Sequence, residues 1–203
     1  MRQRAGAKET DINIWTILIR LSVVIDVFNR RLGRFMIWPI FLAVIVSAGN
    51  AISRKFFDAS SNAFLELQWY LFGFAFLGAA GYVLMVDEHV RIDAIAQRLR
   101  PRTKALIDLV LLVVFVLPMT GLFGILGYDF FLTGWVSEEV SSNAGSLVRW
   151  PAYAFIPFGM LCLGLQALSE IIRRAAWLYG HADRPNLSEA DLPPFLPEPG
   201  GGK

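Results

Sequence analysis

Four long runs of the chain contain no charged residue. They are Phe35–Ser53, Leu67–Val86, Leu109–Tyr128 and Trp150–Ser169, and a charged residue stands at both ends of each run. A helix that crosses a bilayer needs about 20 consecutive, mostly apolar residues. A buried helix of a soluble protein would normally keep a polar stripe over such a length. The pattern predicts an all-α membrane protein with four transmembrane helices, at about residues 35–53, 66–86, 107–128 and 150–172 of a membrane domain formed by residues 34–178.

A fifth apolar stretch precedes the first run, but charge interrupts it. Residues 12–33 are mostly apolar apart from Arg20, Asp26 and the basic residues at their end. Placing Arg20 in the middle of the bilayer would cost about 2.5–3.5 kcal/mol on insertion scales. We therefore predict an interfacial amphipathic helix at residues 12–33, after a cytoplasmic N-terminal segment at residues 1–11. The alternative is a signal peptide, which Arg20 and the lack of a small-residue cleavage site disfavour.

The segment between the second and third runs has a similar pattern on a smaller scale. In Val90–Leu99 the apolar residues fall at helical spacing, and Pro101 follows them. This predicts a short amphipathic arm between transmembrane helices 2 and 3. Residues 179–203 are polar and then rich in Pro and Gly, which is typical of a disordered cytoplasmic tail.

The basic residues predict the orientation of the four spans. Of the 19 Lys and Arg residues, 16 fall in the two termini and the loop after the second span, and three in the other two loops. Loops rich in Lys and Arg stay in the cytoplasm. Both termini are therefore expected in the cytoplasm, and the loop that contains Asn143 is expected outside.

Composition agrees with a membrane protein and excludes several other classes. Hydrophobic residues make up 55% of the chain and charged residues 18%, against about 25% charged in soluble domains. A net charge of +2 gives no support for nucleic-acid binding. The lone Cys162 lies in an apolar run, and both histidines, His89 and His181, lie in polar segments. We predict no metal, no cofactor and no enzymatic activity, since neither a ligand cluster nor a nucleophile–base pair is present.

The apolar runs also lack the groups that transport or redox chemistry requires. Ionisable residues inside a span usually mark an ion path or a proton relay, and haem needs axial ligands, usually His, within the helices. Instead the runs contain many glycines and alanines, which let helices approach closely. These small residues indicate packing within the four-helix unit or a docking face for another membrane protein.

Three stretches of the chain resemble the small membrane subunit, called Q-type or DctQ-like, of tripartite ATP-independent periplasmic (TRAP) transporters. The first is Asn62–Tyr70, with the Glu-Leu pair at Glu66. The second runs from Gly78–Leu84 to His89–Asp93. The third is Glu139–Gly145, followed by Arg149-Trp150 and Ile156-Pro157. The resemblance covers about residues 35–178. It departs from the family at Ala144, where a Pro is common, and at Asp87 and Glu88, where a basic residue and a Gly are common.

The resemblance implies an auxiliary role in secondary active transport. In this family a large multispan permease subunit carries the substrate and sodium sites, and a periplasmic solute-binding protein delivers the solute, usually an organic acid. The small subunit binds the large one in the lipid bilayer of the bacterial inner membrane, as part of its scaffold. The residues that would make partner contacts are Glu66, Trp69, His89, Arg91, Asp93, Glu139, Ser141, Asn143 and Arg149.

Two alternatives stay open at this point. Each of these residues could instead serve as a solvated loop residue, a helix cap or a headgroup contact. The chain could also be a self-sufficient homo-oligomeric transporter or channel, with Glu66, Asn50 and Gln68 as the polar groups nearest a pore.

Overall fold

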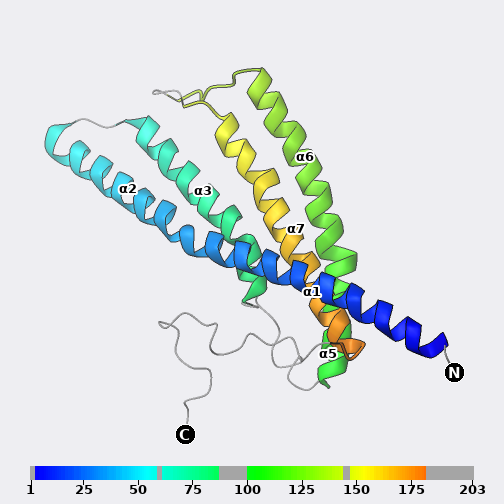
Figure 1. Ribbon diagram of the computed structural model, residues 1–203. Helices are drawn as coiled ribbons and strands as arrows, with labels where there is room; N and C mark the ends of the chain where they lie inside the picture. Colours follow the sequence, from blue (N-terminus) through cyan, green and yellow to red (C-terminus); the bar gives the residue numbers. More distant parts are fainter. Residues whose placement is uncertain (1–2, 59–60, 87–99, 144–146, 182–203) are drawn as a thin grey trace, which may run out of the picture.

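The structure is a bundle of long helices. The computed structural model describes residues 3–58, 61–86, 100–143 and 147–181, with the side chains of the first helix from residue 14 onward. Within these ranges no strand occurs, apart from an isolated bridge between Val140 and Val148. The helices shown in Figure 1 are α1 (Gln3–Phe35), α2 (Ile37–Phe57), α3 (Asn62–Met85), α5 (Pro101–Leu111), α6 (Leu117–Val136) and α7 (Trp150–Leu178), with a π-helical turn η1 (Leu112–Val116) between α5 and α6.

The predicted fold class is confirmed. In the described part of the chain, four helical stretches are long and apolar enough to cross a membrane, namely Ile14–Phe57, Asn62–Met85, Pro101–Val136 and Trp150–Leu178. These helices are longer than the charge-free runs, because the polar and aromatic residues that flank the runs are also helical. The predicted arm at Val90–Leu99 and the tail from residue 182 lie outside the described residues.

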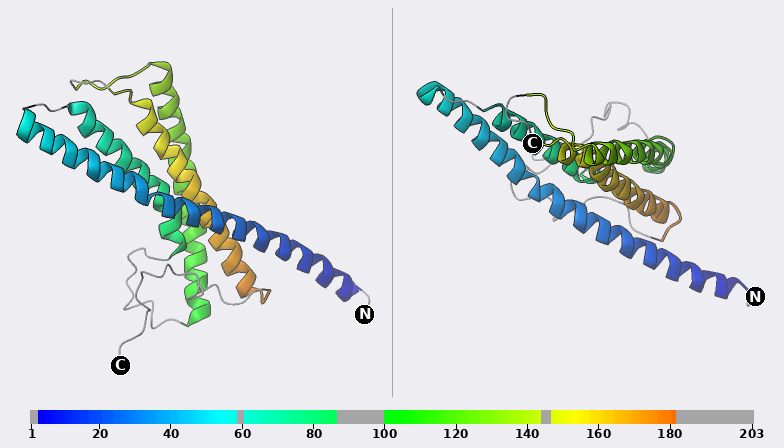
Figure 2. Two further views of the ribbon diagram at one scale, coloured as in Figure 1. Left: turned by 60° about the vertical axis from the view of Figure 1, so that its left-hand side comes forward. Right: turned by 90° about the horizontal axis from the view of Figure 1, so that it is seen from above.

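Helix α7 is at the centre of the bundle. It packs against α6 on one side and α3 on the other, and α2 packs mainly on α3. The first helix crosses this row and contacts both α7 and α3. Seen from above, α1 and α2 run along one side of the other helices (Figure 2). The predicted N-terminal amphipathic helix is thus present as a helix, and it lies against the bundle.

Helices α1 and α2 form one nearly continuous rod. The only interruption is Met36, which is 1% exposed and packs against Gly78 of α3. Pro39 is in the first turn of α2, where a missing N–H does no harm. The apolar part of the rod has 44 residues. At 1.5 Å per residue this is about 66 Å, twice the thickness of a hydrocarbon core of about 30 Å. Only part of the rod can therefore cross the membrane directly.

Helix α6 follows a change in helical geometry. The π-helical turn η1 comes immediately before α6, whose second residue is Pro118. A proline ring clashes with the carbonyl group four residues earlier, which here belongs to Val114 in the π turn. A wider turn at this point relieves the clash, and the chain continues as one long helical stretch from Pro101 to Val136.

Two glycines allow α7 and its neighbours to approach closely. A Cβ atom on Gly159 would lie 2.7 Å from Leu77 Cβ and 2.8 Å from the Leu77 carbonyl oxygen. One on Gly81 would lie 2.5 Å from Asn29 Oδ1 and 2.8 Å from the Cys162 carbonyl oxygen. Small residues therefore pack α3 against α7 inside the unit. Other glycines, Gly49, Gly73 and Gly121, have nothing within 4 Å of such an atom.

Candidate functional site

Three of the predicted contact residues meet at the N-terminal end of α3. Glu66, in the second turn of α3, accepts hydrogen bonds at Oε1 from the Ser141 hydroxyl and from Asn143 Nδ2, the latter at 2.7 Å. The Asn143 N–H donates to Ser141 Oγ at 3.3 Å. Glu66 is 75 residues from Ser141 in the sequence, so the fold alone brings them together. One carboxylate thereby attaches the α6–α7 loop to α3.

The other two loop candidates form an ion pair. Arg149 Nη1 donates to Glu139 Oε1 at 2.8 Å, and the Tyr153 hydroxyl lies 3.2 Å from both oxygens of the same carboxylate. The hydrogen bond with Glu139 raises the pKa of the Arg149 guanidinium, which stays positively charged. The pair closes a short hairpin in which Val140 bridges to Val148. We call Glu66, Glu139, Ser141, Asn143 and Arg149 the outer cluster.

The remaining candidates lie elsewhere. Trp69 is 73% exposed on α3 and belongs to no cluster. His89, Arg91 and Asp93 lie outside the described residues. Tyr70, which sequence reasoning did not select, donates from its hydroxyl to the Val148 carbonyl at 3.2 Å. It provides a second link between α3 and the hairpin, and no spacing signal in the sequence pointed to it.

The contacts of the outer cluster predict how firmly the α6–α7 loop is held in place. Glu66→Ala removes the acceptor that Ser141 and Asn143 share, so we expect the loop to open more often. Trypsin should then cleave after Arg149 several times faster than in the unmodified protein. The conservative Glu66→Gln keeps an oxygen at the same place, so trypsin should cleave this variant after Arg149 at a rate close to that of the unmodified protein. Cleavage at Arg54 serves as the internal reference, and equal rates at Arg149 in all three proteins would contradict the role of Glu66.

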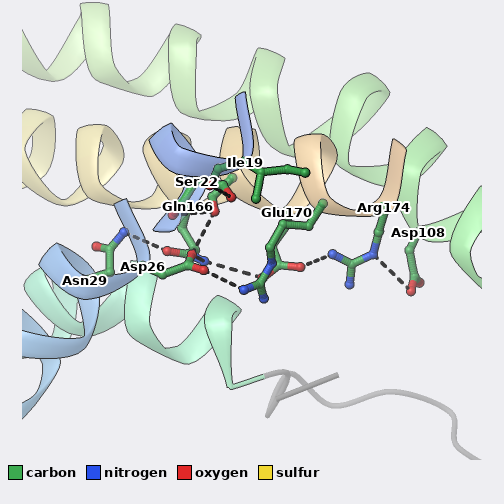
Figure 3. A network of polar contacts seen from close by, with 10 residues as sticks. Ile19, Ser22, Asp26, Asn29, Asp108, Gln166, Glu170 and Arg174 are labelled. Carbon is green, nitrogen blue, oxygen red and sulfur yellow. Dashed lines mark hydrogen bonds and ion pairs between the residues drawn. The ribbon is translucent and has the colours of Figure 1, made fainter. Parts of the chain in front are cut away.

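A second cluster lies deeper in the bundle, between α1 and α7. Ser22, Asp26 and Asn29 share one face of α1, and Gln166, Ser169 and Glu170 share the facing side of α7. All six residues are at most 5% exposed. Polar groups removed from water in this way need partners, since leaving one unpaired is costly. Figure 3 shows Asp26, Asn29 and Gln166 pointing toward one another.

The amide of Gln166 is the central hydrogen-bonding group of this contact. Its Nε2 donates to Asp26 Oδ1 at 2.9 Å, and its Oε1 accepts from Asn29 Nδ2 at 2.9 Å. The Ser169 hydroxyl donates to the same Asp26 oxygen at 2.7 Å. One face of α1 is therefore joined to α7 by hydrogen bonds in which each helix supplies both donors and acceptors.

Two arginines extend the network to a third helix. Arg173 Nη1 lies 2.5 Å from Asp26 Oδ2, and its Nη2 lies 3.1 Å from Glu170 Oε1. Arg174 pairs with Glu170 and lies 3.6 Å from Asp108 of α5. The residues that join α1, α7 and α5 form the inner network: Ser22, Asp26, Asn29, Asp108, Gln166, Ser169, Glu170, Arg173 and Arg174.

Sequence reasoning did not predict the inner network, although Glu170 and Arg173, which pair in it, are only three residues apart. It treated Asp26 as an interruption in an apolar segment, whereas this residue is the main acceptor of the network. The available signal was the helical spacing of Ser22, Asp26 and Asn29, which places all three on one face. Among the described residues, no group of three His, Cys, Asp or Glu side chains could hold a metal ion.

Comparison with known proteins identifies the family. Searches of curated proteins and of solved structures returned no match. A family model described as "Tripartite ATP-independent periplasmic transporters, DctQ component" matches residues 42–176, which is more than half of the chain. The matched range starts in α2 and ends in α7, and so includes the outer cluster and the α7 part of the inner network. The resemblance read from the sequence is confirmed: this chain belongs to the DctQ-component family of TRAP transporters, as a small permease subunit.

Proposed function

We propose that the chain is a fixed frame for a larger permease. It would assemble with a large, sodium-coupled, multispan permease subunit and work with a periplasmic solute-binding protein to import an organic-acid-like solute. The observation that supports this role is the inner network, in which the buried polar groups of α1, α5 and α7 pair with one another. Groups used in this way hold helices together and are not available to bind a solute.

A frame must resist tilting while another part moves. The inner network attaches α1 across the bundle, and the rod of α1 and α2 is too long to cross the membrane directly. We propose that the N-terminal part of α1 lies along the cytoplasmic interface, as the charged residues of the 12–33 segment favour. A helix along the surface and a helix across the bilayer, joined at Met36, would oppose rotation of the unit in two directions.

The proposed orientation assigns different partners to the two ends. With both termini in the cytoplasm, the outer cluster faces the periplasm, where the loop would meet the large subunit or the docked binding protein. The contacts within the outer cluster support a preformed loop for this purpose. Exposed Trp69 is a candidate contact for the large subunit within the same end of the bundle. His89, Arg91 and Asp93 remain proposed contacts on the cytoplasmic side.

Copurification tests the proposal. The tagged chain, extracted in mild detergent from cells that also make a large permease subunit and its binding protein, should copurify with the large subunit. Vesicles containing the large subunit, the small subunit and the binding protein should take up solute in a sodium gradient. Omission of the small subunit should abolish most of this uptake, because the moving subunit would lose its frame.

The alternative of a self-sufficient homo-oligomer predicts the opposite result. Its pore would need free polar groups, yet Oε1 of Glu66 is bonded within the outer cluster, and Asn50 Oδ1 accepts from the Ser61 N–H at 3.3 Å. An open groove of about 570 Å³ between α2 and α3 lies beside Asn50. Uptake by vesicles that contain this chain alone would reject the frame role in favour of the homo-oligomer.

A further inference from the structure

A small pocket lined by tryptophan and a carboxylate lies where α6 leads into α7. It has a volume of about 380 Å³ and is lined by Trp135, Glu138, Val140, Val148 and Trp150. The two indole rings meet edge to face, with centroids 4.5 Å apart and planes at 68°. This pocket is distinct from the outer cluster, of which it contains no member.

The two adjacent acidic residues at this end have different surroundings. Glu139 is held by Arg149 and Tyr153. Glu138 lines the pocket, is exposed, and has no ion pair with any residue that the structure describes. Its backbone is in the left-handed region, with φ of 49°, directly after α6 ends at Val136. Residues other than Gly and Asn are uncommon in this helix-ending conformation, so the position is occupied by a glutamate against the usual preference.

A carboxylate beside tryptophan rings is a combination that recognises an ammonium group. The electron-rich face of indole attracts a cation within about 6 Å of the ring, and the carboxylate adds an opposite charge. The apolar walls provided by Val140 and Val148 suit the carbon atoms that carry such a group. Arg149, the nearest basic residue of the hairpin, is already paired with Glu139 and does not neutralise the pocket.

We propose that this pocket binds the ammonium of a phosphatidylethanolamine-type lipid headgroup. The pocket is next to a lipid-accessible apolar surface, since Leu132, Val136 and Val140 are 39%, 80% and 52% exposed. Tryptophan is enriched at the headgroup level of membrane proteins, which puts the rings at the depth of the lipid ammonium. A bound lipid would thus connect α6, the hairpin and α7 at the membrane surface. The inference does not depend on the proposed transport role.

Native mass spectrometry of the full chain in detergent tests the lipid site. The probes are phosphatidylethanolamine and phosphatidylglycerol of identical acyl chains, which differ in the ammonium. We expect the unmodified protein to retain phosphatidylethanolamine about fivefold better. The substitutions Glu138→Gln and Trp135→Leu should each remove most of that preference.

Two substitutions at the same end of the bundle serve as matched controls. Asp129→Asn removes another exposed carboxylate of α6, and Trp69→Leu removes an exposed tryptophan of α3. Both should leave the preference unchanged. Equal retention of the two lipids by the unmodified protein would overturn the proposal, as would a preference that persists in Glu138→Gln and Trp135→Leu. Loss of the preference in the control variants would also overturn it. Crosslinking of Glu138 to a lysine of a partner protein, without lipid preference, would reassign the pocket to that partner.

Discussion

Replacing Asp26 by alanine is expected to destabilise the membrane domain by about 3–5 kcal/mol, the typical cost of removing one partner of a buried ion pair. The Asp26 side chain is only 8% exposed and accepts from Arg173, Gln166 and Ser169. Without it, a partly buried guanidinium, an amide and a hydroxyl lose their acceptor together. Loss of so many bonds at one point should detach α1 from α7, and the part of the bundle around it should open.

Cys162 provides the measurement. It is 1% exposed, and no other cysteine is present in the chain, so a thiol-reactive dye reports directly on the opening of α7. The dye should react at a markedly lower temperature in Asp26→Ala than in the unmodified protein. Asp26→Asn keeps one acceptor oxygen and should lie between the two, while Asp129→Asn should match the unmodified protein.

A double substitution distinguishes two effects of losing Asp26 on stability. One is the unpaired charge left on Arg173, and the other is the lost contact between α1 and α7. Asp26→Leu combined with Arg173→Met replaces the ion pair by apolar groups of similar size, which is often close to neutral. This double variant should be more stable than Asp26→Leu alone. If Asp26→Ala reacts with dye as slowly as the unmodified protein, the inner network does not hold α1 in place.

Gly159→Ala should be the second most damaging substitution, at about 1–3 kcal/mol, the usual cost of overpacking a well-packed interior. Its new methyl group would meet the Leu77 backbone, which cannot rotate away as a side-chain end can. Helices α3 and α7 would have to separate, and this contact is one of the main ones in the bundle. The same dye assay at Cys162 detects the change.

The matched control is a glycine that faces open space. Gly73→Ala adds a methyl group with nothing within 4 Å, and alanine favours a helix over glycine by about 0.5–1 kcal/mol. Gly73→Ala should therefore be neutral or slightly stabilising, unless a partner helix packs there in the assembled complex. Equal effects of Gly159→Ala and Gly73→Ala would show that helix propensity, and not contact between helices, decides the outcome.

The spans could be predicted from the sequence because the bilayer imposes a simple requirement on them. The uninterrupted apolar runs that contain Gly73 and Gly121 have few interpretations other than transmembrane helices in a chain of this composition. The position of α1 could not be predicted in the same way. Asp26 and Arg173 are 147 residues apart, and each taken alone indicates only a charge near an interface. Their pairing depends on the crossing of two helices, which local spacing does not encode.

The candidate site could likewise be predicted from the sequence only in part. The residues of the outer cluster were selected by resemblance to a family, and five of the nine selected residues lie together. Their mutual contacts could not be derived, because Glu66 and Asn143 approach only when the loop folds back over α3. Tyr70 and Tyr153 were missed since an aromatic residue at a membrane edge has an ordinary explanation as part of the aromatic belt.

The central place of α7 has a consequence for biosynthesis. Helix α1 leaves the ribosome long before α7, and at about 5–20 residues per second the interval for 147 residues is about 7–30 s. During that time Asp26 has none of its α7 partners, and α3 lacks its neighbour at Gly159. Helix α7, the last of the four described spans to be made, therefore completes the contacts of the earlier ones, so that the N-terminal helices wait in an open arrangement until α7 is inserted.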